Sequence, residues 1–206
     1  MSYQNLEQAI IHTDYTIWYY LNIVWQNSFL DTVVPYIRNQ WTWAPLYLFL
    51  LIFMLKNFGI KGALWCLFFL VTFAISDQLS AHLLKPIFMR LRPCNNPFLQ
   101  PIAHVIVPCG SGFSFPSSHA ANHFALAVFA SVSLRFLGKW IVPTAMIWAL
   151  SVAYAQVYVG VHFPFDVFCG GLLGSAVGLL TGKLFNRFFS LNDQNKKNEL
   201  ITTFDA

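Results

Sequence analysis

Charged side chains are scarce in this sequence. Asp, Glu, Lys and Arg make up 10% of the 206 residues, whereas soluble domains carry about 25%. Hydrophobic residues make up 57% and aromatic residues 17%, including 21 Phe. A soluble fold of this length could not hide that much apolar surface, but lipid can act as its solvent. The composition therefore excludes an ordinary soluble domain and predicts an integral membrane protein.

Several other features are missing. The 12 Lys and Arg residues do not cluster with exposed polar partners, so we expect no nucleic-acid ligand. The first residues include Glu7 and Asp14 and lack the basic segment that begins a cleavable signal peptide. We therefore expect the first spanning helix to direct membrane insertion. Internal repeats and low-complexity linkers are absent, and the length suits one domain.

Five apolar segments are candidates for membrane-spanning helices: 41–55, 60–84, 118–136, 140–159 and 165–185. A bilayer core of about 30 Å requires roughly 20 helical residues, so the first segment is short. Pro45 near its start is compatible with a helix, because a proline in the first turn removes no hydrogen bond within the helix. We predict an all-α integral-membrane helical bundle with about five transmembrane helices.

Residues 1–40 mix apolar, aromatic and polar side chains. Trp and Tyr, which are frequent there, prefer the boundary between membrane and water. We predict an N-terminal interfacial segment with a helix over 1–40, a membrane domain over 41–190 and a polar cytoplasmic tail over 191–206. A sixth spanning helix over about 13–37 is the alternative.

Positive charge divides unequally between the two sides of the predicted spans. Four cations fall on one side: Arg38, Lys85, Arg90 and Arg92. Eight fall on the other: Lys56, Lys61, Arg135, Lys139, Lys183, Arg187, Lys196 and Lys197. Positive residues gather in cytoplasmic loops, so we expect the loop 85–116 to face outward. We predict a multi-pass protein of a bacterial inner membrane, with this loop in the periplasm.

The four cysteines fit this orientation. Cys66 and Cys169 lie in apolar segments, where we expect buried, unreactive thiols. Cys94 and Cys109 both lie in the outward loop and can form a disulfide if that compartment is the periplasm. Closing a loop of about 15 residues contributes roughly 3 kcal/mol in the chain-entropy model. We predict a Cys94–Cys109 disulfide, and two unlinked loop cysteines are the alternative.

Polar residues are concentrated in three short stretches, 85–93, 115–119 and 161–166. All three lie at ends of predicted spans on the outward side, so they could converge on one pocket. In the first, Lys85 and Arg92 could neutralise a tetrahedral anion, with the guanidinium holding two oxygens. Snorkelling of both side chains at the membrane surface is the alternative.

The second stretch places Ser117, Ser118 and His119 at the start of a span. A helix N-terminus offers free N–H groups and partial positive charge, which suit phosphate. An ordinary N-cap is the alternative. In the third stretch, Asp166 could accept a proton from one ring nitrogen of His162 and leave the other nitrogen free to attack. A buried His–Asp pair without chemistry is the alternative.

Together the three stretches resemble the motifs of the type-2 phosphatidic acid phosphatase superfamily, which includes the vanadium haloperoxidases. The family motifs are Lys-x6-Arg-Pro, Pro-Ser-Gly-His and Ser-Arg-x5-His-x3-Asp, and the resemblance covers about residues 60–185. Matching residues, in motif order, are Lys85, Arg92 and Pro93; Pro116, Ser117 and His119; and His162 and Asp166. Two departures are Ser118 in place of Gly, and Ala155-Gln156 in place of Ser-Arg.

The resemblance implies a membrane lipid phosphatase that needs no metal or other cofactor. It implies that His162 is the nucleophile and forms a phosphohistidine, and that Asp166 orients it. His119 would protonate the leaving oxygen and later activate water. The residues implied to hold the phosphoryl oxygens are Lys85, Arg92, Ser117, Ser118 through its backbone N–H, and Gln156.

The implied substrate is a lipid phosphate monoester or diphosphate, in a class that includes undecaprenyl diphosphate, phosphatidylglycerophosphate, phosphatidic acid and lipid A phosphate. A carrier-lipid diphosphate suits an outward site best. Gln156 can donate a hydrogen bond but lacks charge, and Arg90 is one candidate source of part of the missing charge. We expect both departures to tune rate or substrate choice. The alternatives are a lipid phosphotransferase using the same site and a lipid-binding protein with a degenerate site.

Overall fold

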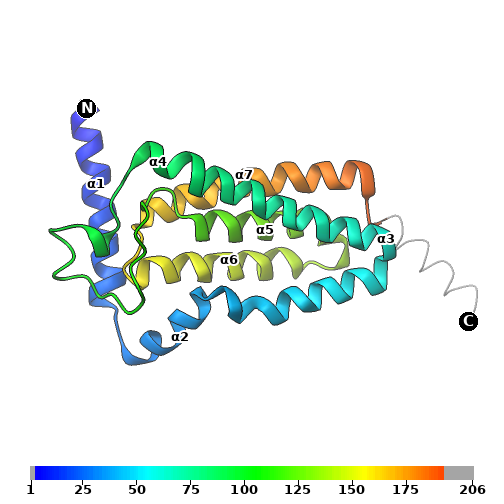
Figure 1. Ribbon diagram of the computed structural model, residues 1–206, viewed down its shortest axis with the longest axis horizontal. Coiled ribbons are helices and arrows are strands. Elements are labelled where there is room, and N and C mark those ends of the chain that lie inside the picture. Colours follow the sequence, from blue (N-terminus) through cyan, green and yellow to red (C-terminus); the bar gives the residue numbers. More distant parts are fainter. Residues whose placement is uncertain (1–2, 193–206) are drawn as a thin grey trace, which may run out of the picture.

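The computed structural model describes residues 3–192, and all their regular elements are helices (Figure 1). Residues 193–206, which make up most of the predicted polar tail, lie outside the described residues. In chain order the helices are α1 (Tyr3–Tyr19), the π-helical η1 (Tyr20–Val24), α2 (Ser28–Arg38), the 3₁₀-helical η2 (Gln40–Trp43), α3 (Ala44–Asp77), the π-helical η3 (Gln78–Leu84), α4 (Lys85–Phe88), the 3₁₀-helical η4 (Pro93–Asn95), α5 (Ser118–Leu134), the 3₁₀-helical η5 (Arg135–Leu137), α6 (Ile141–Tyr158) and α7 (Pro164–Phe189).

Helix α3 reverses its direction at Gly59, where φ is +53°, a value that favours glycine. The two arms run in opposite directions from this point (Figure 1), and they are close together beside it, where a Cβ on Gly62 would fall 1.9 Å from the carbonyl oxygen of Met54. Within residues 3–192, four helical stretches are long and apolar enough to cross a membrane: Gln40–Asn95, Ser118–Leu137, Ile141–Tyr158 and Pro164–Phe189. The reversal divides the first of them into two arms, which correspond to the predicted segments 41–55 and 60–84. The predicted all-α membrane bundle is confirmed.

Helices α5 and α7 lie in close contact because glycine recurs at every fourth residue along one face of α7. A Cβ on Gly170, Gly174 or Gly178 would lie within 2.5 Å of a backbone oxygen in α5 or its N-cap Ser117. Small residues allow helix backbones to approach closely in a membrane. The close packing brings the first turns of α5 and α7 together, and these turns carry the second and third polar stretches.

Helix α1 lies across one end of the bundle rather than along it (Figure 1). It continues through η1 to Val24, and a turn then precedes α2, whose N-cap Asn27 accepts a hydrogen bond from the backbone of Leu30. The alternative of a single spanning helix over 13–37 is therefore wrong, because the helix breaks inside that range. Trp18 packs with Phe163 and fixes α1 against the bundle. An interfacial location for residues 1–40 stays a prediction that this crosswise orientation supports.

Candidate active site

The three polar stretches meet at the end of the bundle that α1 crosses. The backbone N–H of Ser114 donates to the carbonyl oxygen of Arg90 at 2.7 Å. The N–H of Ser117 donates to the carbonyl oxygen of Asp166 at 3.0 Å. These bonds join the loop after α4, the start of α5 and the start of α7. In the same loop, Cys94 and Cys109 form a disulfide.

His162 lies in the turn between α6 and α7, and its side chain is 2% exposed. The turn uses the left-handed conformation of Gly160, whose φ is +79°. The N–H of His162 donates to the carbonyl oxygen of Gln156 at 3.2 Å. Burial lowers the pKa of the His162 imidazole from 6.5 to about 4. The ring is therefore neutral at neutral pH, as a nucleophile must be.

Asp166 is fully buried in the first turn of α7. Its Oδ2 accepts hydrogen bonds from the backbone N–H of Phe163, at 2.8 Å, and from the hydroxyl of Ser114. Its Oδ1 lies 2.6 Å from Nη1 of Arg90. The distance from Oδ2 to Nδ1 of His162 is 3.6 Å, which exceeds a hydrogen bond. The expected direct hydrogen bond from His162 to Asp166 is thus replaced by a bridge through the hydroxyl of Ser114.

Ser114 fixes the tautomer of His162. An ionised carboxylate only accepts hydrogen bonds, so the single hydroxyl proton of Ser114 is donated to Asp166. The Ser114 oxygen, 3.2 Å from Nδ1 of His162, must then accept a proton from that nitrogen. Nδ1 therefore carries the hydrogen, and Nε2 keeps a free lone pair. This is the arrangement that a histidine nucleophile requires.

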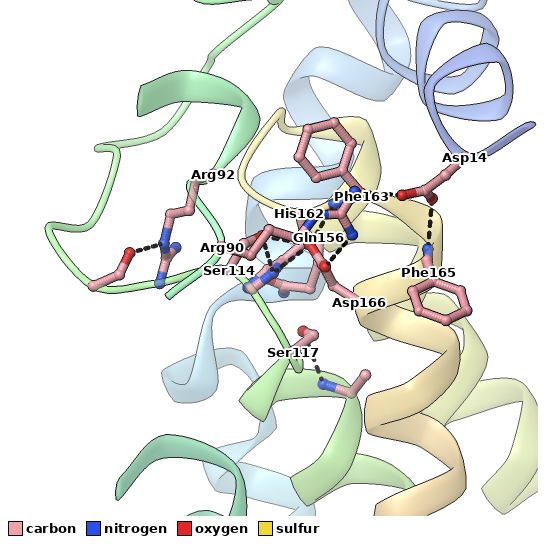
Figure 2. A network of polar contacts seen from close by, with 12 residues as sticks. Asp14, Arg90, Arg92, Ser114, Ser117, Gln156, His162, Phe163, Phe165 and Asp166 are labelled. Atoms are coloured by element: carbon pink, nitrogen blue, oxygen red, sulfur yellow. Dashed lines mark hydrogen bonds and ion pairs between the residues drawn. The ribbon is translucent and has the colours of Figure 1, made fainter. Parts of the chain in front are cut away.

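Arg90 connects α1 to the N-terminal end of α7 (Figure 2). Its Nη2 lies 2.6 Å from Oδ2 of Asp14, while its Nη1 pairs with Asp166. Its guanidinium lies 4.1 Å from the ring centre of Phe163, and Asp14 also accepts a hydrogen bond from the backbone of Phe165. Arg90 is occupied by two carboxylates. The suggestion that it supplies charge to a phosphate cradle is therefore wrong.

The second motif forms the N-terminus of α5. The buried hydroxyl of Ser117 caps the helix by accepting from the N–H of Ala120 at 3.4 Å, a bond that leaves its own proton available. The buried hydroxyl of Ser118 has no hydrogen-bond partner among residues 3–192. His119 is half-buried, and its carbonyl oxygen lies 2.8 Å from Nδ1 of His123. Ser117 is therefore the N-cap of α5, as the alternative expects, and its hydroxyl proton is not used by the cap.

Three cations lie near enough to the two histidines to act on them electrostatically. The charges of Lys85 and Arg92 act on His162, and the charges of Lys85 and Arg38 act on His119. Arg92 donates through Nε to the carbonyl oxygen of Gly112 at 2.9 Å (Figure 2). No carboxylate of residues 3–192 forms an ion pair with any of the three cations. This end of the bundle is therefore prepared for an anion.

Gln156, the residue that departs from the family motif, is fully buried in the last turn of α6. Its Oε1 accepts a hydrogen bond from Nε of Arg38 at 3.2 Å. The structure therefore adds Arg38, Ser114 and Asp14 to the residues around the site. Residues 3–192 contain no group of three or more His, Cys, Asp or Glu side chains placed to hold a metal ion.

Comparison with known proteins identifies similar chains. The family model described as the PAP2 superfamily matches residues 63–190. A lipid A 4′-phosphatase of Bacteroides thetaiotaomicron is 35% identical over 157 residues, which are 75% of this chain and 69% of that protein. An undecaprenyl-diphosphatase of Sulfolobus acidocaldarius is 32% identical over 144 residues, 69% of this chain and 63% of that protein. The crystal structure of a transmembrane PAP2-type phosphatidylglycerolphosphate phosphatase from Bacillus subtilis matches with a TM-score of 0.66 and 25% identity, covering 87% of this chain and 88% of that one.

Proposed function

The chain belongs to the PAP2 superfamily and is an integral-membrane lipid phosphatase, and from this premise we propose that it transfers the phosphoryl group of a lipid to His162 and then to water. The observation that carries the proposal is the unpaired charge of Lys85, Arg92 and Arg38 around His119 and His162. All three cations are half-buried, and removing charge from water without a partner anion is costly. A bound phosphoryl group would offset that cost.

In the proposed reaction, Nε2 of His162 attacks phosphorus, and the bond from phosphorus to the leaving oxygen breaks; that oxygen is the ester oxygen of a monoester or the bridging oxygen of a diphosphate. His119 gives a proton to the departing oxygen and then accepts one from the water that attacks the phosphohistidine. Free phosphate leaves, and both imidazoles return to their starting states. Lys85, Arg92, the hydroxyl of Ser117 and the backbone N–H of Ser118 would stabilise the charge on the phosphoryl oxygens.

We propose that the phosphatase domain comprises residues 41–190 and that the site faces the periplasm from a bacterial inner membrane. Ile87, Phe88 and Met89 follow Lys85 and are each more than half exposed. Exposed apolar side chains beside the cations suit a membrane surface, where a lipid could bring its phosphate from the side. The smaller number of Lys and Arg residues on this side supports the outward orientation.

A lipid A-type phosphate monoester is the first candidate substrate, because the lipid A 4′-phosphatase is the more similar of the two curated relatives described above. A carrier-lipid diphosphate, which the outward site favours, is the second, and the undecaprenyl-diphosphatase supports it. The proposal predicts that purified protein releases phosphate from at least one member of a panel containing lipid A, undecaprenyl diphosphate, phosphatidylglycerophosphate and phosphatidic acid.

The matched variants for this panel are His162→Ala and His104→Ala. His104 lies at the same end of the bundle, but it forms a hydrogen bond with Asp31 at 2.8 Å and belongs to none of the three motifs. We expect His162→Ala to abolish phosphate release and His104→Ala to retain it. Equal activity of His162→Ala and wild type would refute the nucleophile. Transfer of label from substrate to a second lipid, without free phosphate, would indicate a phosphotransferase. A wild type inactive on the whole panel would favour a lipid-binding protein.

A further inference from the structure

Arg38 lies outside the three motifs, yet its guanidinium reaches the buried side chain next to the nucleophile. It belongs to the last turn of α2, while Gln156 belongs to the last turn of α6, 118 positions later. The carbonyl oxygen of Gln156 accepts the N–H of His162 at 3.2 Å. Arg38 is therefore one hydrogen-bonded residue away from the turn that carries His162.

The contact with Arg38 fixes the orientation of the Gln156 amide. A guanidinium has only donors, so the Gln156 atom that lies 3.2 Å from Nε of Arg38 must be the oxygen. The amide nitrogen Nε2 then points elsewhere. It is buried and has no hydrogen-bond partner among residues 3–192. The two donors of this buried amide are therefore available to an acceptor on a ligand.

Arg38 also lacks a partner for part of its side chain. It is half-buried, and desolvation lowers its pKa. No carboxylate of residues 3–192 pairs with it. Its charge acts on His119, the proposed general acid, and on Arg92, which is proposed to bind phosphate. Among the described residues 3–192, its one hydrogen bond is the bond from Nε to Gln156. Its two Nη groups can therefore donate hydrogen bonds to the oxygens of a bound anion.

We propose that Arg38 and Gln156 act as one phosphate-binding unit, in which the Nη groups of Arg38 and Nε2 of Gln156 donate to phosphoryl oxygens. This assignment rests on the proposed phosphatase function. It makes α2, which lies outside the matched residues 63–190, part of the active site. The positive charge that Gln156 lacks is supplied from another helix.

The test compares full-length Arg38→Gln with Arg135→Gln, which makes the same charge change on an exposed residue of η5. Orthovanadate, a phosphate mimic, measures anion binding through its inhibition constant. Turnover is measured with a water-soluble aryl phosphate and with a lipid phosphate. We expect Arg38→Gln to weaken vanadate inhibition and to lower kcat/KM for both substrates by about 10- to 100-fold, the range for a lost charged hydrogen bond. Arg135→Gln should match wild type.

The inference would be overturned if the vanadate inhibition constant of Arg38→Gln were within 2-fold of wild type. It would also be overturned if kcat/KM fell for the lipid substrate alone, because that result would assign Arg38 to the headgroup or the membrane surface. If Arg38→Gln does not fold, Arg38→Lys keeps the charge but removes the Nε donor and the paired Nη groups. Unchanged vanadate inhibition in Arg38→Lys would also overturn the inference. His162→Ala separates the two proposals. If His162→Ala is active, the phosphatase mechanism is refuted. If His162→Ala is inactive and Arg38→Gln behaves like wild type, only the Arg38–Gln156 unit is refuted.

Discussion

The hydroxyl oxygen of Ser114 lies 3.2 Å from Nδ1 of His162 and donates its proton to the carboxylate of Asp166. A serine thus connects the imidazole to the acid that is four residues further along the chain. The consequence is that Asp166 acts on His162, the proposed nucleophile, mainly through the neutral hydroxyl of Ser114. The geometry of the loop before α5 therefore determines which nitrogen of His162 is free.

Removal of the Ser114 hydroxyl tests this relationship. In Ser114→Ala, Nδ1 of His162 loses its acceptor, and the carboxylate of Asp166 remains 3.6 Å away. We expect kcat to fall by about 10- to 100-fold, because an unpaired buried polar group costs roughly 1–3 kcal/mol. Ser131→Ala is the control, since Ser131 is buried in α5 but its hydroxyl has no hydrogen-bond partner among residues 3–192. Equal kcat in Ser114→Ala and wild type would show that the bridge is dispensable.

The pH dependence of His162 gives a second prediction. Burial lowers its pKa from 6.5 to about 4, so the folded protein takes up this proton at lower pH than the unfolded chain does. The nucleophilic neutral form should persist as pH falls through 6.5 and should be lost only near pH 4. NMR titration of the His162 ring separates this event from the second ionisation of a substrate phosphate, which occurs near pH 6. A midpoint near 6.5 would contradict the buried environment.

The sequence predicts which residues reach this end of the bundle, but not all of their contacts. Apolar runs reveal the spans, and the ends of alternate spans share one side of a membrane, so Lys85, His119 and His162 could be assigned to one pocket. The pairing of Arg38 with Gln156 joins residues 118 positions apart. It depends on how α2 packs beside α6, and residues 28–38 contain none of the three motifs that would indicate this.

Ser114 could not be identified for a similar reason. It is one of several small polar residues in the loop before α5, and its partner His162 lies 48 positions away. The backbone bond from Ser114 to Arg90 helps to hold the loop where the hydroxyl reaches the imidazole. Arg90 itself was placed near the site by its position, but its partner Asp14 lies in α1, whose crosswise packing the sequence does not specify.

The ion pairs of Arg90 lead to a third prediction. Asp14 is 5% exposed and Asp166 is fully buried, so Arg90→Gln would leave two buried carboxylates without their cation. Breaking a buried ion pair in this way costs about 3–5 kcal/mol. Asp14→Asn should cost less, because Arg90 keeps Asp166 and the Asn side chain still accepts a hydrogen bond. Thermal unfolding in detergent measures both, and we expect the larger fall in Tm for Arg90→Gln. The reverse order would mean that Arg90 does not hold α1 to α7.

The glycine face of α7 determines how closely the two halves of the site approach. In Gly174→Ala, the new Cβ would lie 2.0 Å from the carbonyl oxygen of Ala121, so α5 and α7 must separate. Gly171→Ala is the matched control on the same helix, where the Cβ would meet the ring of Phe124 at 3.4 Å, an ordinary contact. Both changes gain the same helix propensity, about 1 kcal/mol.

Overpacking at Gly174 should lower the free energy of unfolding by about 1–3 kcal/mol, and it should also lower activity. The reason is that the bond from the N–H of Ser117 to the carbonyl oxygen of Asp166, which aligns the two motifs, crosses the same interface. The Tm and kcat/KM should therefore fall together in Gly174→Ala, whereas Gly171→Ala should keep kcat/KM and have a Tm at or above that of wild type. A Gly174→Ala protein with reduced Tm but full kcat/KM would show that the alignment of α5 on α7 tolerates separation, and that the site depends on its loops instead.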